Sequence, residues 1–340
     1  MNCLKSIGIL TIAISCQTCA GVETKKPAAV GLHSLPAGVL RLREACLQKK
    51  TEDIIPVCRR VFRMNREDGE VAQRLGWLLY LYGKVPEGVA HLRKACSLQP
   101  NNPEPLYQLG IALEKRGDRP GALDSYIQAV SIQTDYMQAR IAQGVLLRKM
   151  KKEKESEKVL REAIKLVPNS ASAWAELSIT LARLERLDSA IHAGEKAVSL
   201  EPSDANAHSN LGLFLVSAGR TQEGISELKK AMEIEPENAT AWYNLGLAYT
   251  KSDALEEAAY AYQHALLIRE EFAQAHHGLA IVLVSLGICE KSKRHFNRSH
   301  ELGIKSIPAV LEQYQNICKQ RIENRTNVGP DNQNLKDSEG

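Results

Sequence analysis

The amino-acid sequence predicts an all-α fold, a solenoid of antiparallel helical hairpins that ends in a C-terminal capping helix. A segment of 34 residues repeats seven times without insertion, as units 69–102, 103–136, 137–170, 171–204, 205–238, 239–272 and 273–306. A fixed period of this length is the signature of a repeat architecture. Hydrophobic residues make up 44% of the chain but aromatic residues only 5%, and such a core suits closely packed helices better than a β-sandwich.

Three places in every unit hold only glycine, alanine or serine: the eighth, the twentieth and the twenty-seventh, which in the first unit are Gly76, Gly88 and Ala95. Small side chains let the two helices of a hairpin approach closely. A proline follows the second helix in four units: Pro100, Pro168, Pro202 and Pro236. A glycine marks the turn between the two helices in four units: Gly83, Gly117, Gly219 and Gly287.

The chain begins with a predicted export signal at residues 1–15. Met1–Lys5 carries one positive charge, and the ten residues Ser6–Ser15 form an apolar run about half as long as a bilayer-spanning helix. This arrangement is typical of a secretory signal rather than a transmembrane anchor. The segment Ala13–Cys16 resembles the bacterial lipobox, so Cys16 is the candidate lipidation site. One alternative is a signal-peptidase cut after Ala20, which releases a soluble protein. The other is that the protein is not exported.

Two segments precede the repeats. Residues 16–34 are expected to form a tether between the membrane or cleavage site and the solenoid. Residues 35–68 are expected to form a degenerate helical hairpin that covers the apolar end of the stack. Cys46 and Cys58 stand on the two helices of this hairpin, so they are the candidate disulfide of an exported protein. Buried free thiols are the alternative.

The repeat resembles the tetratricopeptide repeat (TPR) family, and the resemblance extends from Gly69 to Ser306. Trp174 and Trp242 stand where the family favours tryptophan, and Tyr249 where it favours tyrosine. The resemblance implies a right-handed superhelical solenoid with a concave groove that binds extended peptides or partner helices. The third and seventh units lack several of the favoured residues, so we expect them to be the least regular.

Two segments follow the repeats. Residues 307–321 are predicted to form the capping helix, because their apolar residues recur at helical spacing. These residues are Val310, Leu311, Tyr314 and Ile317. Residues 322–340 are polar and rich in asparagine, and we expect this tail to be disordered.

The sequence contains no arrangement of residues typical of an enzyme. GxSxG, P-loop and GxGxxG motifs are absent, so we expect no catalytic activity, no cofactor and no small-molecule substrate. The histidines have no carboxylate or cysteine partners at metal-ligand spacing, so we expect no metal site. The net charge of +4 is too small to make nucleic acid the default partner.

The first set of candidate binding residues is polar and lies on the first helices of units five and six. Its members are Asn206, Ser209, Asn210, Thr240, Tyr243 and Asn244. Asn210 and Asn244 occupy the same place one unit apart, and a carboxamide both donates and accepts hydrogen bonds, as a peptide group does. This pair resembles the asparagine ladder by which some TPR proteins hold a peptide backbone. The alternative is that asparagine is simply common at this place.

The second set of candidate binding residues is aromatic and lies in units one and two. Its members are Trp77, Tyr80, Tyr107 and Gln108, with Ile111 beside them. Such a surface suits the anchoring of a partner's side chains. The alternative is that the N-terminal hairpin covers Trp77 and Tyr80.

These features predict a non-catalytic protein–protein interaction scaffold that binds partner peptides or helices in its groove. We expect an exported protein of the bacterial periplasm, attached to the envelope membrane only through a lipid on Cys16, that helps to assemble or tether an envelope complex. The alternative function is an accessory or regulatory subunit of an envelope enzyme, such as a glycosyltransferase acting in trans.

Overall fold

The computed structural model describes residues 36–49, 51–304, 312, 316–318 and 320. In this part of the chain all regular structure is helical and no strand is present, which confirms the all-α prediction. Three predicted segments lie outside the described residues: the signal peptide 1–15, the tether 16–34 with Cys16, and the tail 322–340. No helix among the described residues has both the length and the apolar character needed to cross a bilayer.

An N-terminal hairpin precedes the seven units. It consists of α1 (Ala37–Gln48), the short 3-10 helix η2 (Glu52–Ile54) and α2 (Ile55–Met64). Each 34-residue unit then contributes two helices. In chain order they are α3 (Gly69–Leu81), α4 (Val85–Leu98), α5 (Glu104–Arg116), α6 (Arg119–Ile132), α7 (Met137–Lys149), α8 (Glu153–Leu166), α9 (Ala171–Arg183), α10 (Leu187–Leu200), α11 (Ala205–Ser217), α12 (Thr221–Ile234), α13 (Ala239–Lys251), α14 (Leu255–Ile268), α15 (Ala273–Ser285) and α16 (Cys289–Glu301).

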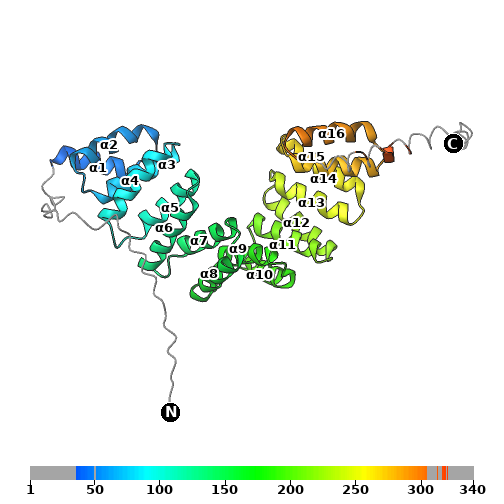
Figure 1. Cartoon of the computed structure of the whole chain (residues 1–340), viewed down its shortest axis with the longest axis horizontal. Coiled ribbons are helices and arrows are strands. Elements are labelled where there is room, and N and C mark those ends of the chain that lie inside the picture. Colours follow the sequence, from blue (N-terminus) through cyan, green and yellow to red (C-terminus); the bar gives the residue numbers. More distant parts are fainter. Residues whose placement is uncertain (1–35, 50, 305–311, 313–315, 319, 321–340) are drawn as a thin grey trace, which may run out of the picture.

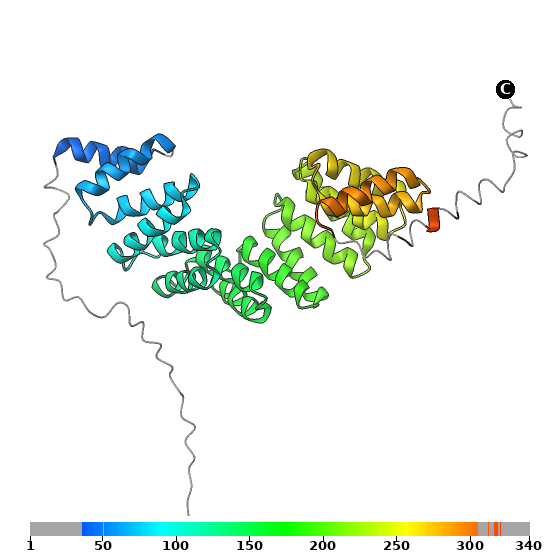
Figure 2. The ribbon, with the colours of Figure 1, turned by 45° about the horizontal axis from the view of Figure 1, so that its top comes forward.

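The units stack side by side into an arc. Each helix packs against the next along the chain, and α9, α11, α13 and α15 also contact the odd-numbered helix of the preceding unit. In Figure 1 the odd-numbered helices lie on the inner side of the arc and the even-numbered helices on its outer side. Figure 2 shows the same arc from another direction, with α1 and α16 at opposite ends. We call the two sides the inner and the outer surface.

Glycines at the predicted places let the two helices of a unit approach to backbone contact. A Cβ atom on Gly76 of α3 would lie 2.9 Å from the backbone nitrogen of Leu92, and one on Gly88 of α4 would lie 2.8 Å from the carbonyl oxygen of Gly76. Neither distance is tolerated without a backbone shift. Glycine at these two places therefore sets the spacing between α3 and α4.

Each unit reverses its direction through a left-handed residue at its fifteenth place. The four predicted glycines have φ between 78° and 88°, whereas Lys151, Glu185 and Asp253 have φ of 60°. The next residue donates its N–H to the carbonyl five residues earlier, as Arg186 does to Leu181 at 3.0 Å. This hydrogen bond is typical of the Schellman motif that ends helices. Three units therefore hold a side chain in a conformation that favours glycine.

The tryptophan site, at the fourth place, makes the same hydrogen bond in units three to seven. The indoles of Trp174 and Trp242 donate to the carbonyl six residues earlier at 2.9 Å. Arg140, His208 and His276 contact the corresponding carbonyl of Thr134, Pro202 and Glu270. The expected irregularity of the third unit does not extend to these features, because Arg140 replaces the tryptophan's donor and α7 and α8 match α9 and α10 in length. In unit seven, α16 is one residue shorter than the other second helices.

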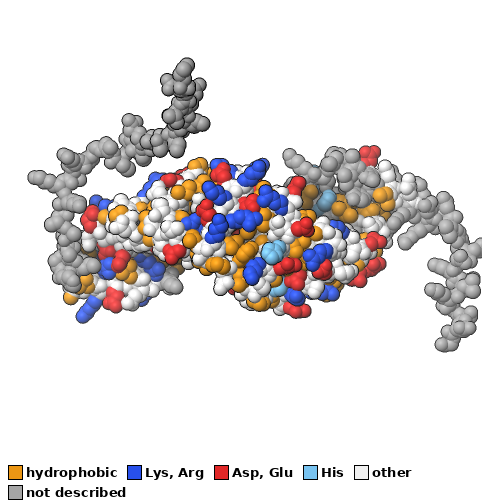
Figure 3. All heavy atoms as spheres, turned by 90° about the horizontal axis from the view of Figure 1, so that it is seen from below, with side chains coloured by type: hydrophobic (Ala, Val, Ile, Leu, Met, Phe, Trp, Pro, Cys, Tyr) orange, Lys and Arg blue, Asp and Glu red, His pale blue; other side chains and the backbone are white. Residues whose placement is uncertain are grey.

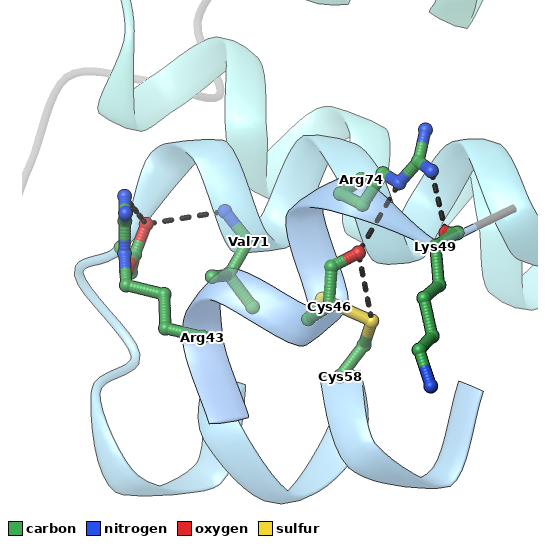
Figure 4. The surroundings of a disulfide bond; sticks show 7 residues. Arg43, Cys46, Lys49, Cys58, Val71 and Arg74 are labelled. Carbon is green, nitrogen blue, oxygen red and sulfur yellow. Dashed lines mark hydrogen bonds and ion pairs between the residues drawn. A yellow bond between two sulfur atoms is a disulfide. The ribbon is translucent and has the colours of Figure 1, made fainter. Parts of the chain in front are cut away.

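Disulfides join helices at both ends of the solenoid. Cys46 of α1 is bonded to Cys58 of α2, with Cα atoms 5.1 Å apart. Figure 4 shows Arg74 of α3 next to this disulfide, where its guanidinium donates to the carbonyls of Cys46 and Lys49 at the end of α1. At the other end, Cys289 is bonded to Cys318.

The second disulfide joins α16 to the segment expected to cap the repeats. Ile317 and Cys318 pack against Ala280 and Phe296, and the described residues of 307–321 are helical. The sequence analysis did not pair Cys289 with Cys318. Among the described cysteines only Cys96 is free.

Candidate protein-binding surface

A row of apolar side chains follows the inner surface through all seven units. The residue at the ninth place of each unit is apolar and partly exposed: Trp77, Ile111, Val145, Ile179, Leu213, Leu247 and Ile281. The eighth place faces the second helix of its unit, and each helical residue is rotated by about 100° from the one before it. The ninth side chain therefore points to the side of the contact between the two helices rather than directly into it. We call these seven residues the inner stripe.

At its N-terminal end the inner stripe widens into an aromatic surface. Trp77 and Tyr80 stack with their ring centroids 4.8 Å apart, next to a cavity of about 400 Å³. The N-terminal hairpin packs against Leu75, Leu78 and Leu79 and leaves Trp77 and Tyr80 partly exposed. The aromatic surface is therefore accessible. The residues that line its cavity are Tyr80, Ile111, Glu114, Lys115 and Tyr126.

Two polar groups of this cavity, those of Glu114 and Tyr126, already have partners. The hydroxyl of Tyr126 lies 3.4 Å from one carboxylate oxygen of Glu114, and Lys149 Nζ lies 2.6 Å from the other. Burial raises the pKa of Tyr126, and the charge of Glu114 raises it further. Burial also raises the pKa of Tyr107. Both tyrosines are therefore neutral at physiological pH, and the cavity offers a partner mainly apolar ring surface.

Gln108 belongs to a chain of hydrogen bonds between side chains. Gln99 donates to Gln73 at 3.3 Å, Gln73 to Gln108 at 3.3 Å, and Gln108 to Glu104 at 2.8 Å. The hydroxyl of Tyr136 donates to the other oxygen of Glu104. This chain connects unit one, unit two and the start of α7. Gln108 therefore joins units and does not present a free carboxamide to a partner.

The asparagine ladder differs from the expectation. Asn244 is only 5% exposed, and its Nδ2 donates to Oγ of Ser209 at 2.9 Å. This bond joins α13 to α11 at the same two places as the bond between Gln73 and Gln108. Asn244 therefore holds two units together, and of the two predicted rungs only Asn210 is partly exposed.

The remaining polar candidates lie around this pair. Asn206 and Thr240 are exposed in the first turns of their helices, and their backbone N–H groups donate to the capping side chains of Asp204 and Asn238. Tyr243 is half-buried, with its ring centroid 5.0 Å from that of Phe272, and burial raises its pKa. These residues provide one edge of the inner surface rather than a separate polar site.

Charged side chains of both signs are distributed over the molecule. Figure 3 shows acidic, basic and hydrophobic side chains interspersed on the face that it presents. Several ion pairs connect neighbouring units, such as Arg148 with Glu176 at 2.6 Å and Arg186 with Glu157 at 3.0 Å. Within the described ranges, no three histidine, cysteine, aspartate or glutamate side chains are placed to hold a metal ion.

Comparisons with protein families identify the repeats. A family model described as TPR repeat matches residues 76–117 and 214–253, and models described as tetratricopeptide repeat match residues 142–205 and 239–272. A TPR repeat-containing protein of Pseudomonas aeruginosa is 34% identical over 111 residues, which are 31% of this chain and 44% of that protein. The chain therefore spans less than half the length of this curated relative.

Solved structures share the fold. The Cut9–Hcn1 hetero-tetramer of the APC/C has a chain with a TM-score of 0.61 and 16% identity, over 86% of this chain and 56% of that one. A tetratricopeptide repeat protein from Parabacteroides merdae has a TM-score of 0.59 and 14% identity, over 75% and 98% of the two chains. PilF of Pseudomonas aeruginosa has a TM-score of 0.53 and 15% identity, over 62% and 96%. At these identities the likeness shows the fold alone.

Proposed function

Because the chain contains tetratricopeptide repeats stacked into a solenoid, we propose that it is a non-catalytic scaffold that binds a segment of a partner protein along its inner surface. The observation that carries this proposal is the inner stripe. Seven apolar side chains stay partly exposed at one place of seven successive units. Four of them also pack partly against the core: Ile111, Ile179, Leu247 and Ile281. Aligned exposed apolar side chains mark protein interaction sites.

The shape of the inner stripe favours an elongated partner. A row of single side chains, one from each unit, matches a partner segment that places apolar residues at intervals, such as an extended peptide or one face of a helix. The stacked rings of Trp77 and Tyr80 and the adjacent cavity add an anchoring point at one end, and aromatic residues contribute strongly to binding energy at interfaces. We therefore expect the partner to place a large apolar side chain against units one and two.

The two disulfides favour an exported protein. Disulfides persist in oxidising compartments such as the bacterial periplasm, and both ends of the solenoid are cross-linked in this way. We propose that the protein is attached to the envelope membrane through a lipid on Cys16 and tethers a complex there. Replacing Cys16 by serine should release the protein from the detergent phase. An unmodified mature N-terminus at Gly21, found by mass spectrometry, would show that the protein is simply secreted.

The scaffold function is tested by capture of partners from chemically crosslinked envelopes. The double variant Ile179→Asp/Leu213→Asp places two carboxylates in the inner stripe and should reduce recovery of a bound partner by about tenfold or more. The matched control is Ile127→Asp on the outer side of α6, where Ile127 is 46% exposed. Thermal melting verifies that each variant is folded. Recovery of the same proteins with the wild type and the double variant would exclude the inner stripe as the binding surface.

A further inference from the structure

The outer surface of unit six carries an exposed apolar and aromatic cluster. Tyr260, His264 and Leu267 lie on α14 at spacings of four and three residues, so they share one face of the helix. Tyr260 is 56% exposed and Leu267 is 80% exposed. Trp242 of α13 stacks on the ring of His264, with centroids 4.4 Å apart. We call these four residues the unit-six cluster.

The other units show that the fold does not require apolar side chains at these places. The residues equivalent to Tyr260 in the other six units are Ala90, Asp124, Lys158, His192, Ser226 and Arg294. Those equivalent to His264 are Lys94, Gln128, Glu162, Lys196, Lys230 and Arg298. Those equivalent to Leu267 are Ser97, Ser131, Lys165, Ser199, Glu233 and Glu301. Only one of these eighteen residues is apolar. The internal packing of the solenoid therefore does not explain Leu267 or Tyr260, and a group of exposed apolar residues marks an interaction surface.

The charges on the two sides of the unit-six cluster are opposite. Towards unit five, Glu233, Glu235 and Glu237 are exposed, and towards unit seven, α16 exposes Lys293 and Arg294. In the described part of the chain, no ion pair joins any of these five side chains to another residue. α12 also exposes Lys229, and α16 also exposes Glu290 and Lys291. The surface is therefore apolar in the middle, with an excess of unpaired acidic charge along one side and of unpaired basic charge along the other.

We propose that a second copy of this chain binds to the unit-six cluster and forms a two-fold symmetric dimer. In such a dimer the same patch of both protomers meets. A two-fold axis parallel to α14 brings the acidic side of each protomer against the basic side of its partner, so the charges complement each other twice. The two copies of α14 then lie side by side in parallel orientation.

The charges exclude the other orientation of the axis. An axis across α14 would bring the acidic side of each protomer against the acidic side of its partner and the basic side against the basic side, and like charges at an interface repel. In the proposed dimer the cluster supplies most of the affinity, because buried aromatic and aliphatic anchors dominate binding energy. The charged sides select the orientation.

The first test measures the oligomeric state of the purified full chain by sedimentation equilibrium over a range of concentrations. We expect reversible dimers, and Leu267→Asp and Tyr260→Asp should each raise the dimer dissociation constant about tenfold or more. Both side chains are exposed, so the thermal midpoint should stay near that of the wild type. Ile127→Asp, which places the same charge on the outer side of α6, should leave the dimer intact. A wild-type chain that stays monomeric, or dimers that persist in both cluster variants, would overturn the proposal.

The second test uses the charges. A Glu233→Lys/Glu237→Lys variant has two basic sides, and a Lys293→Glu/Arg294→Glu variant has two acidic sides. Each should dissociate as a homodimer, whereas an equimolar mixture should form a heterodimer, because each basic side then meets an acidic one. If the mixture dissociates as readily as its components do, the two-fold axis along α14 is wrong. Binding of a different protein to the cluster of a monomeric chain would also exclude self-association.

Discussion

Single side chains with hydrogen-bonding groups join one repeat of this chain to the next. Asn244 bonds to Ser209, Gln73 bonds to Gln108, and the tryptophan sites of units three to seven contact a carbonyl of the preceding unit. The repeat pattern located all of these positions. It did not show that Asn244 is structural, because the identity of one residue does not reveal which side chain of the neighbouring unit accepts its hydrogen bond.

The first residue-scale prediction separates the structural asparagine from the exposed one. Asn244→Ala removes a buried hydrogen bond and should reduce the free energy of unfolding by roughly 1 kcal/mol. Asn210→Ala, at the same place one unit earlier, should leave it nearly unchanged. Chemical denaturation followed by circular dichroism measures both effects. Equal losses in the two variants would show that the bond to Ser209 is not what distinguishes them.

The second residue-scale prediction concerns the histidine pair of unit seven. His276 of α15 and His295 of α16 face each other with their Nδ1 atoms 2.9 Å apart. Burial lowers the pKa of His295 below its usual 6.5, and His276 lowers it further when charged. The unfolded chain therefore binds the proton more readily than the folded chain, so stability is full above about pH 6.5 and decreases as the pH falls below it.

Replacing His295 by glutamine removes this titration. The thermal midpoint of the wild type should fall between about pH 7.5 and about pH 5.5, and that of His295→Gln should fall less. His300→Gln is the control, because His300 is exposed on the same helix. Parallel pH profiles for the wild type and His295→Gln would exclude this histidine as a source of the pH dependence.

Most helices of this chain could be predicted from the repeat, whereas one of the two described disulfides could not. The 34-residue period predicted the fourteen helices of the seven units and their turns, because every unit repeats the same small residues and the same left-handed place. The period gave no information on the disulfide between Cys289 and Cys318, since its second cysteine lies beyond the last repeat. The expected irregularity of the third unit does not extend to its tryptophan site, because Arg140 there donates the same hydrogen bond as Trp174 does in unit four.

At the turn of unit four, Glu185 has φ of 60°, and glycine adopts this conformation without a steric cost. Glu185→Gly should therefore raise the free energy of unfolding by about 1 kcal/mol. Gly219→Ala, at the same place in unit five, should lower it by a similar amount. A loss of stability in Glu185→Gly would mean that contacts of the Glu185 side chain outweigh the backbone effect.

Reduction of the disulfide between Cys46 and Cys58 should destabilise the N-terminal hairpin by roughly 2–4 kcal/mol. The loss should be local, because each unit of a solenoid contacts only its neighbours. Hydrogen exchange in Cys46→Ser/Cys58→Ser should therefore increase in α1 and α2 and change little in α9 to α12. Cys96→Ser is the control, since burial raises the pKa of the Cys96 thiol to about 11 and keeps it unreactive. Faster exchange throughout the solenoid would contradict a local role.

Over the whole molecule, stacking gives an arc whose inner surface is a row of equivalent places. The sequence analysis recognised two parts of this surface, in units one and two and in units five and six, but not the inner stripe that runs through all seven units. The signal was present, since the ninth place of every unit is apolar. Its meaning depends on exposure, which is known only once the first helices are seen to form the inner side of the arc.

The most direct test of the central claim is site-specific photo-crosslinking in living cells. A photoreactive amino acid replaces Ile179 or Leu213 in the inner stripe, or His192 or Ser199 on the outer side of α10 in the same part of the arc. We predict that the two inner positions yield the same discrete adduct with a partner protein and that the two outer positions do not. An adduct from the outer positions alone would contradict binding along the inner surface.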